Sequence, residues 1–503
     1  MSLGRNLIAS MASSVWTALV GLAVVPLYLK YLGVEAYGLI GFFATMQAIF
    51  SLLDLGLATT INREVARYSA AGNLREAGKL LHTLAIIYWG TAAVIALIIV
   101  LLAPFIAGHW LQSTHLPQEN VAHAVMLMGL IAACRWPIGV YQGALMGMQK
   151  LAVSSAVSTI IVTFGSLGSV AILAFVSPTI EAFFTWQACV GLLYALSIRW
   201  LAWRIMRHGQ AIPSRFNIGE LKRIWRFSAG MSGIAFSGVV LMQLDKVLLS
   251  RILSLEDFGR YTLAGVIASG LYMLLTPLFN AIYPRMSALV AIGNTEDLLI
   301  LYKTGTRVFS TILFPIVIFA AIGSEDLVHL WTGNPSLAVS IAPIVSLLLA
   351  GTALNGVMHF PFALQLAYGM TRLPLTITLV LIAIMVPMII VLSMSYGALG
   401  GATAWFILNL LYLFFGTWIT HRKLLKREAL GWLIHDVGFP LGISLTVMSI
   451  GWKIYYVPGN VHANILWGCG LLTLALMINF ILLPKAISMK LRQQILVIIK
   501  SPS

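Results

Sequence analysis

The sequence predicts an all-α polytopic membrane protein that contains an internal repeat. Hydrophobic residues make up 60% of its 503 residues and charged residues only 9%, whereas an ordinary soluble domain has roughly 25% charged residues. Apolar stretches of the length needed to cross a bilayer, about 20 residues, recur along nearly the whole chain. A short motif also occurs twice, 221 residues apart. We therefore expect a helical bundle built from two related units.

Apolar stretches predict about 14 transmembrane helices, of which the first is too long for a cleaved signal peptide and lacks a small-residue cleavage site. The first six are expected at about 7–29, 37–61, 80–106, 122–147, 152–176 and 181–203. The next six are expected at about 228–250, 258–283, 304–322, 338–366, 374–394 and 399–420. The last two are expected at about 436–456 and 463–483.

The repeat pairs the segment Leu32–Gly38 with Leu253–Gly259. The same offset pairs Lys30 with Arg251 and the dipeptide Gly72-Asn73 with Gly293-Asn294. One copy holds six helices, an even number, so the second copy enters the membrane in the same orientation and the repeats are parallel. We expect lobes over 1–220 and 221–427, followed by two extra helices and a basic tail over 428–503.

The distribution of Lys and Arg predicts that both termini are cytoplasmic, because basic residues stay on that side. Five of the expected outer loops, at 108–121, 177–181, 323–337, 395–399 and 457–462, hold no Lys or Arg. The net charge of +15 is spread over short inner loops, which favours contact with anionic lipid headgroups over nucleic-acid binding. Basic segments over 215–226 and 485–500 are expected to lie along the inner membrane surface.

Arg135 is the main candidate for a substrate-binding residue. It lies near the middle of the fourth predicted helix, just before Pro137, where a charge costs a few kcal/mol unless it meets water or a partner. It would bind an anionic headgroup through two parallel hydrogen bonds, or it would pair structurally with a carboxylate or carbonyls of a neighbouring helix. Gln142, further along the helix, would bind sugars or another helix.

Five further charged residues are candidates, each with a structural alternative. Asp54 is either a coupling site or a charge anchored at a helix end. Asp245 would serve in gating or coupling, or would form a local pair with Lys246. Lys246 would face a central cavity or make a local contact, although adjacent helical residues do not face each other. Lys30 and Arg251, at matching outer positions, would attract a diphosphate or hold lipid headgroups.

The motif residues resemble the polysaccharide transporter family, which includes the O-antigen flippases of the multidrug, oligosaccharidyl-lipid and polysaccharide exporter superfamily. The resemblance rests on Leu32–Gly38, Leu53–Leu57, Arg63, Gly72-Asn73 and Asp245-Lys246. It implies a V-shaped pair of six-helix lobes in the bacterial inner membrane. It also implies a polyprenyl-diphosphate-linked oligosaccharide as substrate, membrane lipids as surroundings, and polysaccharide polymerase and chain-length proteins as partners.

The sequence favours a transporter over an enzyme. It holds no Gly-x-x-x-x-Gly-Lys-Ser/Thr loop, no His-Glu-x-x-His pair, and no sizeable soluble domain, so we expect no cofactor and no ATP-driven step. Coupling to protons, sodium ions or the membrane potential stays open. A drug or cation antiporter would favour acidic rather than basic charge at membrane depth. A polysaccharide polymerase or ligase would need a larger outer loop than those present.

Overall fold

The protein is helical throughout the part that the structure, a computed structural model, describes. This part excludes residues 1–2, 55, 208–235, 426–427 and 484–503. Within it there is no β-strand, only an isolated bridge between Gln112 and Ser254. Among the described residues, ten helices are long and apolar enough to cross a membrane, or eleven if one bent pair counts as a single span. The prediction of an all-α, multi-pass membrane protein is confirmed.

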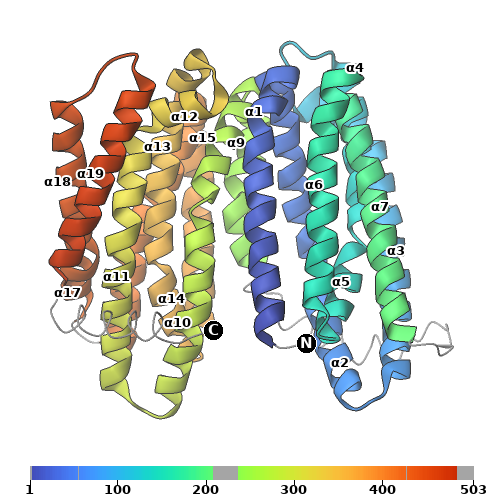
Figure 1. The fold of residues 1–503 in the computed structure, drawn as a ribbon, viewed down its shortest axis with the longest axis horizontal. Helices are drawn as coiled ribbons and strands as arrows, with labels where there is room; N and C mark the ends of the chain where they lie inside the picture. The colour runs from blue at the N-terminus through green and yellow to red at the C-terminus, as the bar shows by residue number, and fades with distance from the viewer. Residues whose placement is uncertain (1–2, 55, 208–235, 426–427, 484–503) are drawn as a thin grey trace. The chain divides into compact units, whose positions relative to one another are not determined.

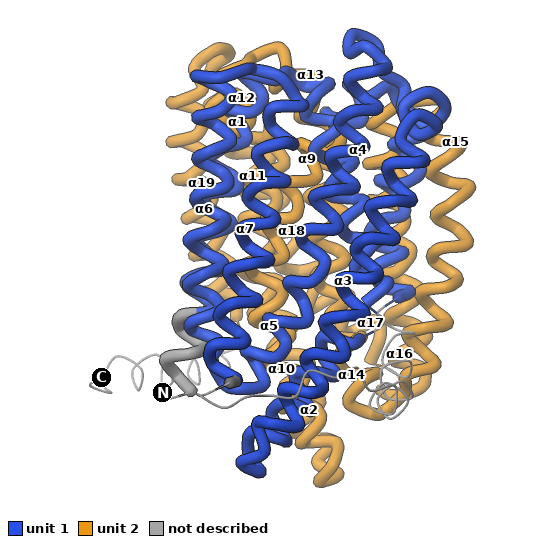
Figure 2. The backbone as a smooth tube through the Cα atoms, turned by 90° about the vertical axis from the view of Figure 1, so that its right-hand side faces the viewer, with its two compact units in different colours: residues 1–259 blue, residues 260–503 orange. Residues whose placement is uncertain are grey.

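The chain forms two compact units, residues 1–259 and 260–503 (Figure 2). The first unit contains α1 (Leu3–Phe50), η1 (Ser51–Asp54), α2 (Leu57–Ala70), α3 (Leu74–Phe105), η2 (Ile106–Trp110), α4 (Gln118–Arg135), α5 (Ile138–Gly147), α6 (Leu151–Phe175), α7 (Ile180–Arg207), and a helix over 236–252. The predicted lobe boundary at 220–221 and the basic segments over 215–226 and 485–500 lie outside the described residues. The lobe division and the count of 14 helices stay predictions.

The second unit begins within α9 (Leu255–Ser269) and is all helical in its described part. Its other elements are α10 (Tyr272–Ala291), α11 (Thr295–Ile322), α12 (Ser324–Thr332), α13 (Pro335–Val357), α14 (His359–Ala367), α15 (Arg372–Leu411), η3 (Tyr412–Gly416), α16 (Thr417–Leu424), α17 (Ala429–Gly431), η4 (Trp432–Gly438), α18 (Phe439–Ile454) and α19 (Val461–Ile481).

The repeated Gly-Asn dipeptides form the same helical turn in each unit. Gly72 and Gly293 take the left-handed conformation, with φ of 71° and 70°, which glycine adopts without steric cost. The side chain of Asn73 then caps α3 by accepting from the backbone of Glu76, and Asn294 caps α11 in the same way. Figure 1 shows both turns at the lower tips of the α2–α3 and α10–α11 hairpins. The sequence repeat is therefore also a structural repeat.

Several predicted helices are broken or bent, which corrects the continuous spans expected from hydropathy. The span over 122–147 is interrupted between α4 and α5, where Pro137 has no N–H to donate. The span over 338–366 is interrupted between α13 and α14, and these two breaks lie at matching positions, since α5 and α14 begin 221 residues apart. The span over 258–283 is bent by 42° between α9 and α10.

Two of the predicted outer turns are tight breaks inside helices that are otherwise continuous. Gly33 (φ 81°) interrupts α1 and Gly397 (φ 59°) interrupts α15. Because such φ values strain residues that carry a side chain, glycine lets the chain reverse there with almost no loop. The turns expected near 29–37 and 394–399 are present, although they are shorter than a separate loop.

The two copies of the repeated motif lie against each other, with a glycine of each at the contact. A Cβ atom added at Gly38 would approach the carbonyl oxygen of Leu255 to under 3.0 Å, and one added at Gly259 would do the same to Val34. Gly38 and Gly259 are motif equivalents, and so are Val34 and Leu255. The contact is therefore reciprocal, and only residues without a side chain allow backbones to approach this closely.

Candidate functional site

Arg135 lies at the end of α4, where the helix stops before Pro137. Its side chain is half-buried, and Nη2 donates a hydrogen bond to Oε1 of Gln187 on α7 at 2.7 Å. The guanidinium carbon also lies 5.8 Å from the centroid of the Phe43 ring, within range of a cation–π interaction. The guanidinium of Arg135 is therefore positioned within the first unit by an amide and an aromatic ring.

Hydrogen bonds on α6 and α7 fix the orientation of the Gln187 amide. Nε2 of Gln187 donates to the hydroxyl of Ser169 at 2.9 Å, and that hydroxyl donates to the carbonyl of Gly165 at 2.9 Å. Oε1 is therefore the atom that faces Arg135. Among the described residues no carboxylate lies within ion-pairing distance of Arg135, so its partner is neutral and its positive charge is not compensated by an acidic side chain there.

Gln142 on α5 belongs to a second polar group that involves the same helix α7. Its Nε2 donates to the hydroxyl of Tyr194 at 2.7 Å and lies 3.3 Å from the hydroxyl of Ser158 on α6. The two hydroxyls also bond to each other. Tyr194 lies seven residues after Gln187, the partner of Arg135, on the same face of α7. The structure therefore brings Arg135 and Gln142 into one polar region of the first unit.

Asp54 sits at a break in the second predicted helix, the span expected over 37–61. After η1 the chain turns at Gly56 (φ 74°), and α2 then begins at Leu57. One carboxylate oxygen of Asp54 accepts from the backbone N–H of Ala58 at 3.2 Å, and the other accepts from the hydroxyl of Tyr88. The predicted continuous helix is wrong here because the left-handed glycine and the side-chain bond replace helical bonds.

Tyr88 connects Asp54 to the break that carries Arg135. The ring of Tyr88 is 2% exposed and packs at 5.9 Å from the ring of Trp136, the residue next to Arg135. Both rings belong to the apolar cluster that joins α2, α3, α5 and α7. Asp54 is therefore linked through Tyr88 and Trp136 to the α4–α5 break. Its role in coupling stays a prediction.

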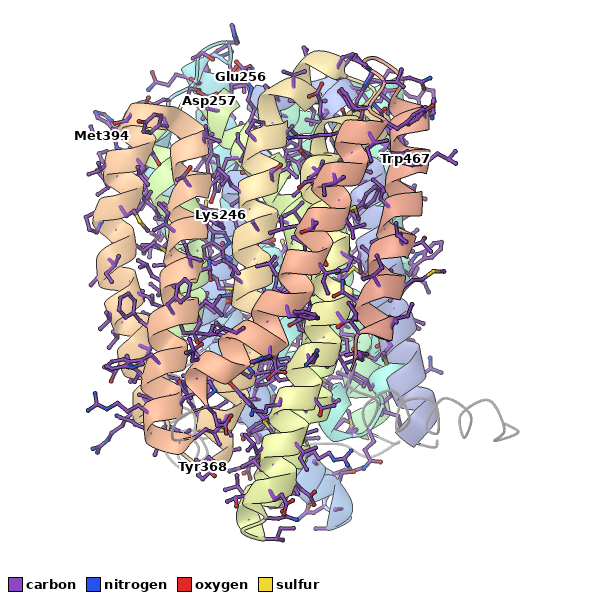
Figure 3. All side chains as sticks on the ribbon, turned by 90° about the vertical axis from the view of Figure 1, so that its left-hand side faces the viewer. Lys246, Glu256, Asp257, Tyr368, Met394 and Trp467 are labelled. Carbon is purple, nitrogen blue, oxygen red and sulfur yellow. The ribbon has the colours of Figure 1, made fainter. Side chains whose placement is uncertain are left out.

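Asp245 and Lys246 lie on the helix over 236–252. Asp245 is only 6% exposed, whereas Lys246 is half-buried and its Nζ lies 3.5 Å from Oε1 of Gln243. Figure 3 shows Lys246 part-way along the helices, below the level of Glu256 and Asp257. Both residues thus occur within a helix rather than in a loop, and their proposed roles stay predictions.

Lys30 and Arg251 are exposed and do not join the polar region around Arg135. The Nζ of Lys30 lies 5.7 Å from the ring centroid of its neighbour Tyr31. At Arg251 it is the backbone carbonyl that accepts a hydrogen bond, from Gln112 at 3.0 Å. This exposure favours the headgroup alternative for both residues.

Several residues that the structure places at this region were not identified from the sequence: Tyr88, Ser158, Ser169 and Tyr194. Serine and tyrosine are common in membrane helices, so only their spacing on adjacent helices could have indicated the network. Glu35, inside the repeated motif, was also without a role. It is 7% exposed, and its carboxylate accepts from the backbone N–H groups of Thr114 and His115, which fixes the loop after η2.

Among the described residues, no three His, Cys, Asp or Glu side chains are grouped so that they could hold a metal ion. The model of the family described as "Polysaccharide biosynthesis protein" matches residues 3–290. The chain belongs to this family. No curated protein matches the chain.

The fold of this chain is similar to that of several solved structures. A lipid II flippase MurJ in an inward closed conformation is 15% identical, with 94% of this chain and 98% of that chain covered and a TM-score of 0.66. An inward-facing MATE family multidrug transporter of the MOP superfamily is 16% identical, with 81% and 94% covered and a TM-score of 0.64. A MOP superfamily transporter from Pyrococcus furiosus is 14% identical, with 94% and 95% covered and a TM-score of 0.53. At these identities the likeness shows the fold.

Proposed function

We propose that this protein is a flippase that moves a polyprenyl-diphosphate-linked oligosaccharide from the inner to the outer leaflet by alternating access. It would act in the bacterial cytoplasmic membrane with both termini in the cytoplasm. The single observation that carries the proposal is Arg135, a guanidinium within the helical span whose hydrogen-bonding partner is the neutral amide of Gln187. The family match supports a role in polysaccharide biosynthesis.

The chemistry of Arg135 supports an anionic substrate. A guanidinium has five N–H donors, and one bond from Nη2 to Gln187 accounts for one of them. The remaining donors are costly to leave unsatisfied at membrane depth, and a diphosphate satisfies two of them in parallel. A cationic drug would instead be repelled by this charge, so the antiporter alternative has weaker support.

Neighbouring polar groups would serve the sugars of such a substrate. Gln142, Tyr194 and Ser158 combine an amide with two hydroxyls on three helices. Amides and hydroxyls both donate and accept hydrogen bonds, as sugar hydroxyls require. The group thus matches an uncharged oligosaccharide that follows the diphosphate.

An apolar groove on the second unit would serve the polyprenyl chain. It has a volume of about 810 Å³ and lies between η3, η4 and α18, where Phe414, Leu433, Ile434 and Phe439 contribute to the lining. Phe414 and Ile434 are 51% and 52% exposed. A long isoprenoid gains about 0.8 kcal/mol for each CH₂ that it buries, so a lining of this kind suits it better than it suits a polar ligand.

The membrane potential could supply the driving force, because no ATP site is expected. Each elementary charge that crosses 100 mV changes the free energy by about 2.3 kcal/mol. Two negative charges that leave an inside-negative cell therefore gain about 4–5 kcal/mol per 100 mV, provided that no cations cross with them. The flipped unit would then pass to polysaccharide polymerase and chain-length proteins.

Deletion of the gene, followed by analysis of the lipid-linked glycans that remain, tests the proposal. We expect one such glycan to accumulate on the inner leaflet and surface glycan to be lost. If no glycan accumulates and the cells become more sensitive to drugs, the protein is an antiporter instead.

The role of Arg135 is tested in the same strain by complementation. Two charge-assisted hydrogen bonds contribute about 1.5–3 kcal/mol each, so we expect Arg135→Ala to lower glycan export more than tenfold at equal protein level. Arg199→Ala is the matched control, because Arg199 is an exposed arginine of α7 and its loss should leave export unchanged. Full complementation by Arg135→Ala would exclude the proposed binding role.

A further inference from the structure

Three buried rings of the second unit meet near the inner ends of its helices. Tyr302 of α11, His421 of α16 and Trp432 of η4 have ring centroids 5.4–5.6 Å apart in all three pairs. Their exposed fractions are 0%, 1% and 0%. An imidazole is thus enclosed between two aromatic side chains.

Two polar atoms of this ring cluster have no hydrogen-bond partner among the described residues, the hydroxyl of Tyr302 and Nε2 of His421. A third such atom, Oε1 of Gln365, belongs to a residue that bonds Thr420, which precedes His421 in the sequence. Gln365 is also fully buried, at 0% exposure. Buried polar atoms almost always have a partner, and each one left without a partner costs about 1–3 kcal/mol. Three such atoms in one region indicate a missing hydrogen-bonding species.

The existing bonds fix where the hydrogens of the ring cluster lie. Nδ1 of His421 is 2.8 Å from the carbonyl oxygen of Thr417, which only accepts, so Nδ1 carries the hydrogen and Nε2 of the neutral ring is a bare acceptor. The hydroxyl of Thr420 donates to the carbonyl of Gly416 at 2.6 Å. Nε2 of Gln365 therefore donates to Thr420 at 2.6 Å, and its Oε1 is likewise a bare acceptor.

The ring cluster is therefore short of hydrogen-bond donors. It offers the two acceptors on His421 and Gln365 but only one further hydrogen, on the hydroxyl of Tyr302, which can satisfy one of them at a time. The third ring adds none, because Nε1 of Trp432 already donates to the hydroxyl of Thr306 at 3.0 Å. One added proton would remove the deficit.

We propose that His421 is a proton-binding site of the second unit, at which Nε2 takes up one proton from the cytoplasmic solution. No other bond forms or breaks in this step: the neutral imidazole becomes an imidazolium, and its charge rises by one. The new N–H supplies the donor that the ring cluster lacks. The aromatic faces of Tyr302 and Trp432 stabilise the cation, since both rings lie within the roughly 6 Å range of cation–π attraction.

A half-exposed ion pair acts on His421 from a distance. Lys303 and Glu428 form this pair, with side chains that are 36% and 32% exposed. The carboxylate of Glu428 favours a charged imidazole and the ammonium of Lys303 opposes it. The other titratable or charged side chains on the neighbouring elements are Arg307 on α11, Tyr412 on η3, Arg422 and Lys423 on α16, and His435 and Asp436 on η4.

The inference deepens the proposed function, on which it rests for its purpose, by naming the proton as the coupling ion. Its test needs no lipid-linked substrate, so its failure can be told apart from failure of the flippase proposal. The test is ¹⁵N nuclear magnetic resonance of the full-length protein in lipid bilayers, with its ten histidines labelled, between pH 8 and pH 4.

We expect one histidine signal, identified by its loss in His421→Gln, to show hydrogen on Nδ1 alone at pH 8 and on both nitrogens at lower pH. Tyr302→Phe removes the unpartnered hydroxyl of the ring cluster, the group that we propose accepts from the new N–H, and should lower the midpoint of this change by about 0.5–1 pH unit. His435→Gln is the control, because exposed His435 makes the same Nδ1 contact to the carbonyl four residues earlier. It should leave the midpoint unchanged.

Two results would overturn the proposal. The first is a His421 signal that stays neutral throughout the range, and the second is a midpoint that does not move in Tyr302→Phe. If His421→Gln fails to fold, Tyr302→Phe still tests the site, because the signal that shifts between it and the wild type identifies the ring.

Discussion

Replacing Gly38 by alanine is expected to force the two copies of the repeated motif apart. The new Cβ would lie under 3.0 Å from the carbonyl oxygen of Leu255 and 3.3 Å from the backbone nitrogen of Gly259. Neither atom belongs to a flexible side chain, so the backbones themselves must separate. The same holds for Gly259→Ala, whose Cβ would meet Val34 and the backbone nitrogen of Gly38.

The magnitude follows from two opposing effects. Overpacking in a close-packed region costs typically 1–3 kcal/mol, whereas alanine in a helix is more favourable than glycine by roughly 0.5–1 kcal/mol. We therefore expect Gly38→Ala to lower the free energy of unfolding by about 0.5–2 kcal/mol. Gly21→Ala, on the same helix with no atom within 4 Å of its Cβ, should instead raise it by roughly 0.5–1 kcal/mol.

The assay is reversible unfolding of the purified protein in mixed micelles, for the single variants and the double variant Gly38→Ala/Gly259→Ala. One separation of the backbones accommodates both methyl groups, so the double variant should cost less than the sum of the singles by about 0.5–3 kcal/mol. Strict additivity, or a Gly38→Ala variant as stable as Gly21→Ala, would refute the reciprocal contact.

Three other changes test separate features. Tyr88→Phe removes the hydroxyl that donates to Asp54 and should lower the free energy of unfolding by about 1–3 kcal/mol; equal stability would show that this bond contributes nothing. Ile434→Trp, which fills the apolar groove, should reduce glycan export several-fold. The control Leu466→Trp should leave export unchanged, because Leu466 of α19 is 77% exposed. Burial raises the pKa of the Asp326 carboxyl outside the spans, so its contribution to stability is present at low pH and is lost as pH rises through the folded-state pKa. Asp326→Asn should therefore raise the thermal unfolding midpoint at pH 7 and lose this advantage below about pH 4, and a pH-independent difference would contradict the assignment.

The sequence predicted the class of fold and much of the repeat because both depend on local chemistry. Apolar length alone identifies helices that cross a bilayer. The pairs Gly72-Asn73 and Gly293-Asn294 predict identical turns because glycine supplies the left-handed residue and asparagine the helix cap. The structure confirms both turns at matching positions.

The interruptions within helices were harder to predict, since hydropathy does not register them. Pro137 indicated a bend, but the break after α13 has its proline only inside the next helix, at Pro361. The break at Gly56 depends on a carboxylate, that of Asp54, which replaces a helical bond. Such exchanges depend on tertiary neighbours, here Tyr88, that sequence spacing does not reveal.

The candidate site was predicted in part. Arg135 and Gln142 were identified because ionisable and amide side chains are rare enough at membrane depth to attract attention. Their partners Tyr194 and Ser158 belong to common residue types, and only the packing of α5, α6 and α7 brings them and Gln187 to these two residues. The ring cluster of Tyr302, His421 and Trp432 was not predicted, because its members come from distant parts of the sequence and only the packing brings them together.

The reciprocity of the motif contact also bears on how such a chain arose. Val34 contacts Gly259 in the same manner as the equivalent residue Leu255 contacts Gly38. Two identical subunits related by a two-fold axis form reciprocal contacts of this kind. Such a contact would hold two copies of one ancestral unit together as a dimer, and fusion of their genes would make that contact permanent. Each half could then acquire residues that its counterpart lacks, as Arg135 stands where the repeat has Gly356.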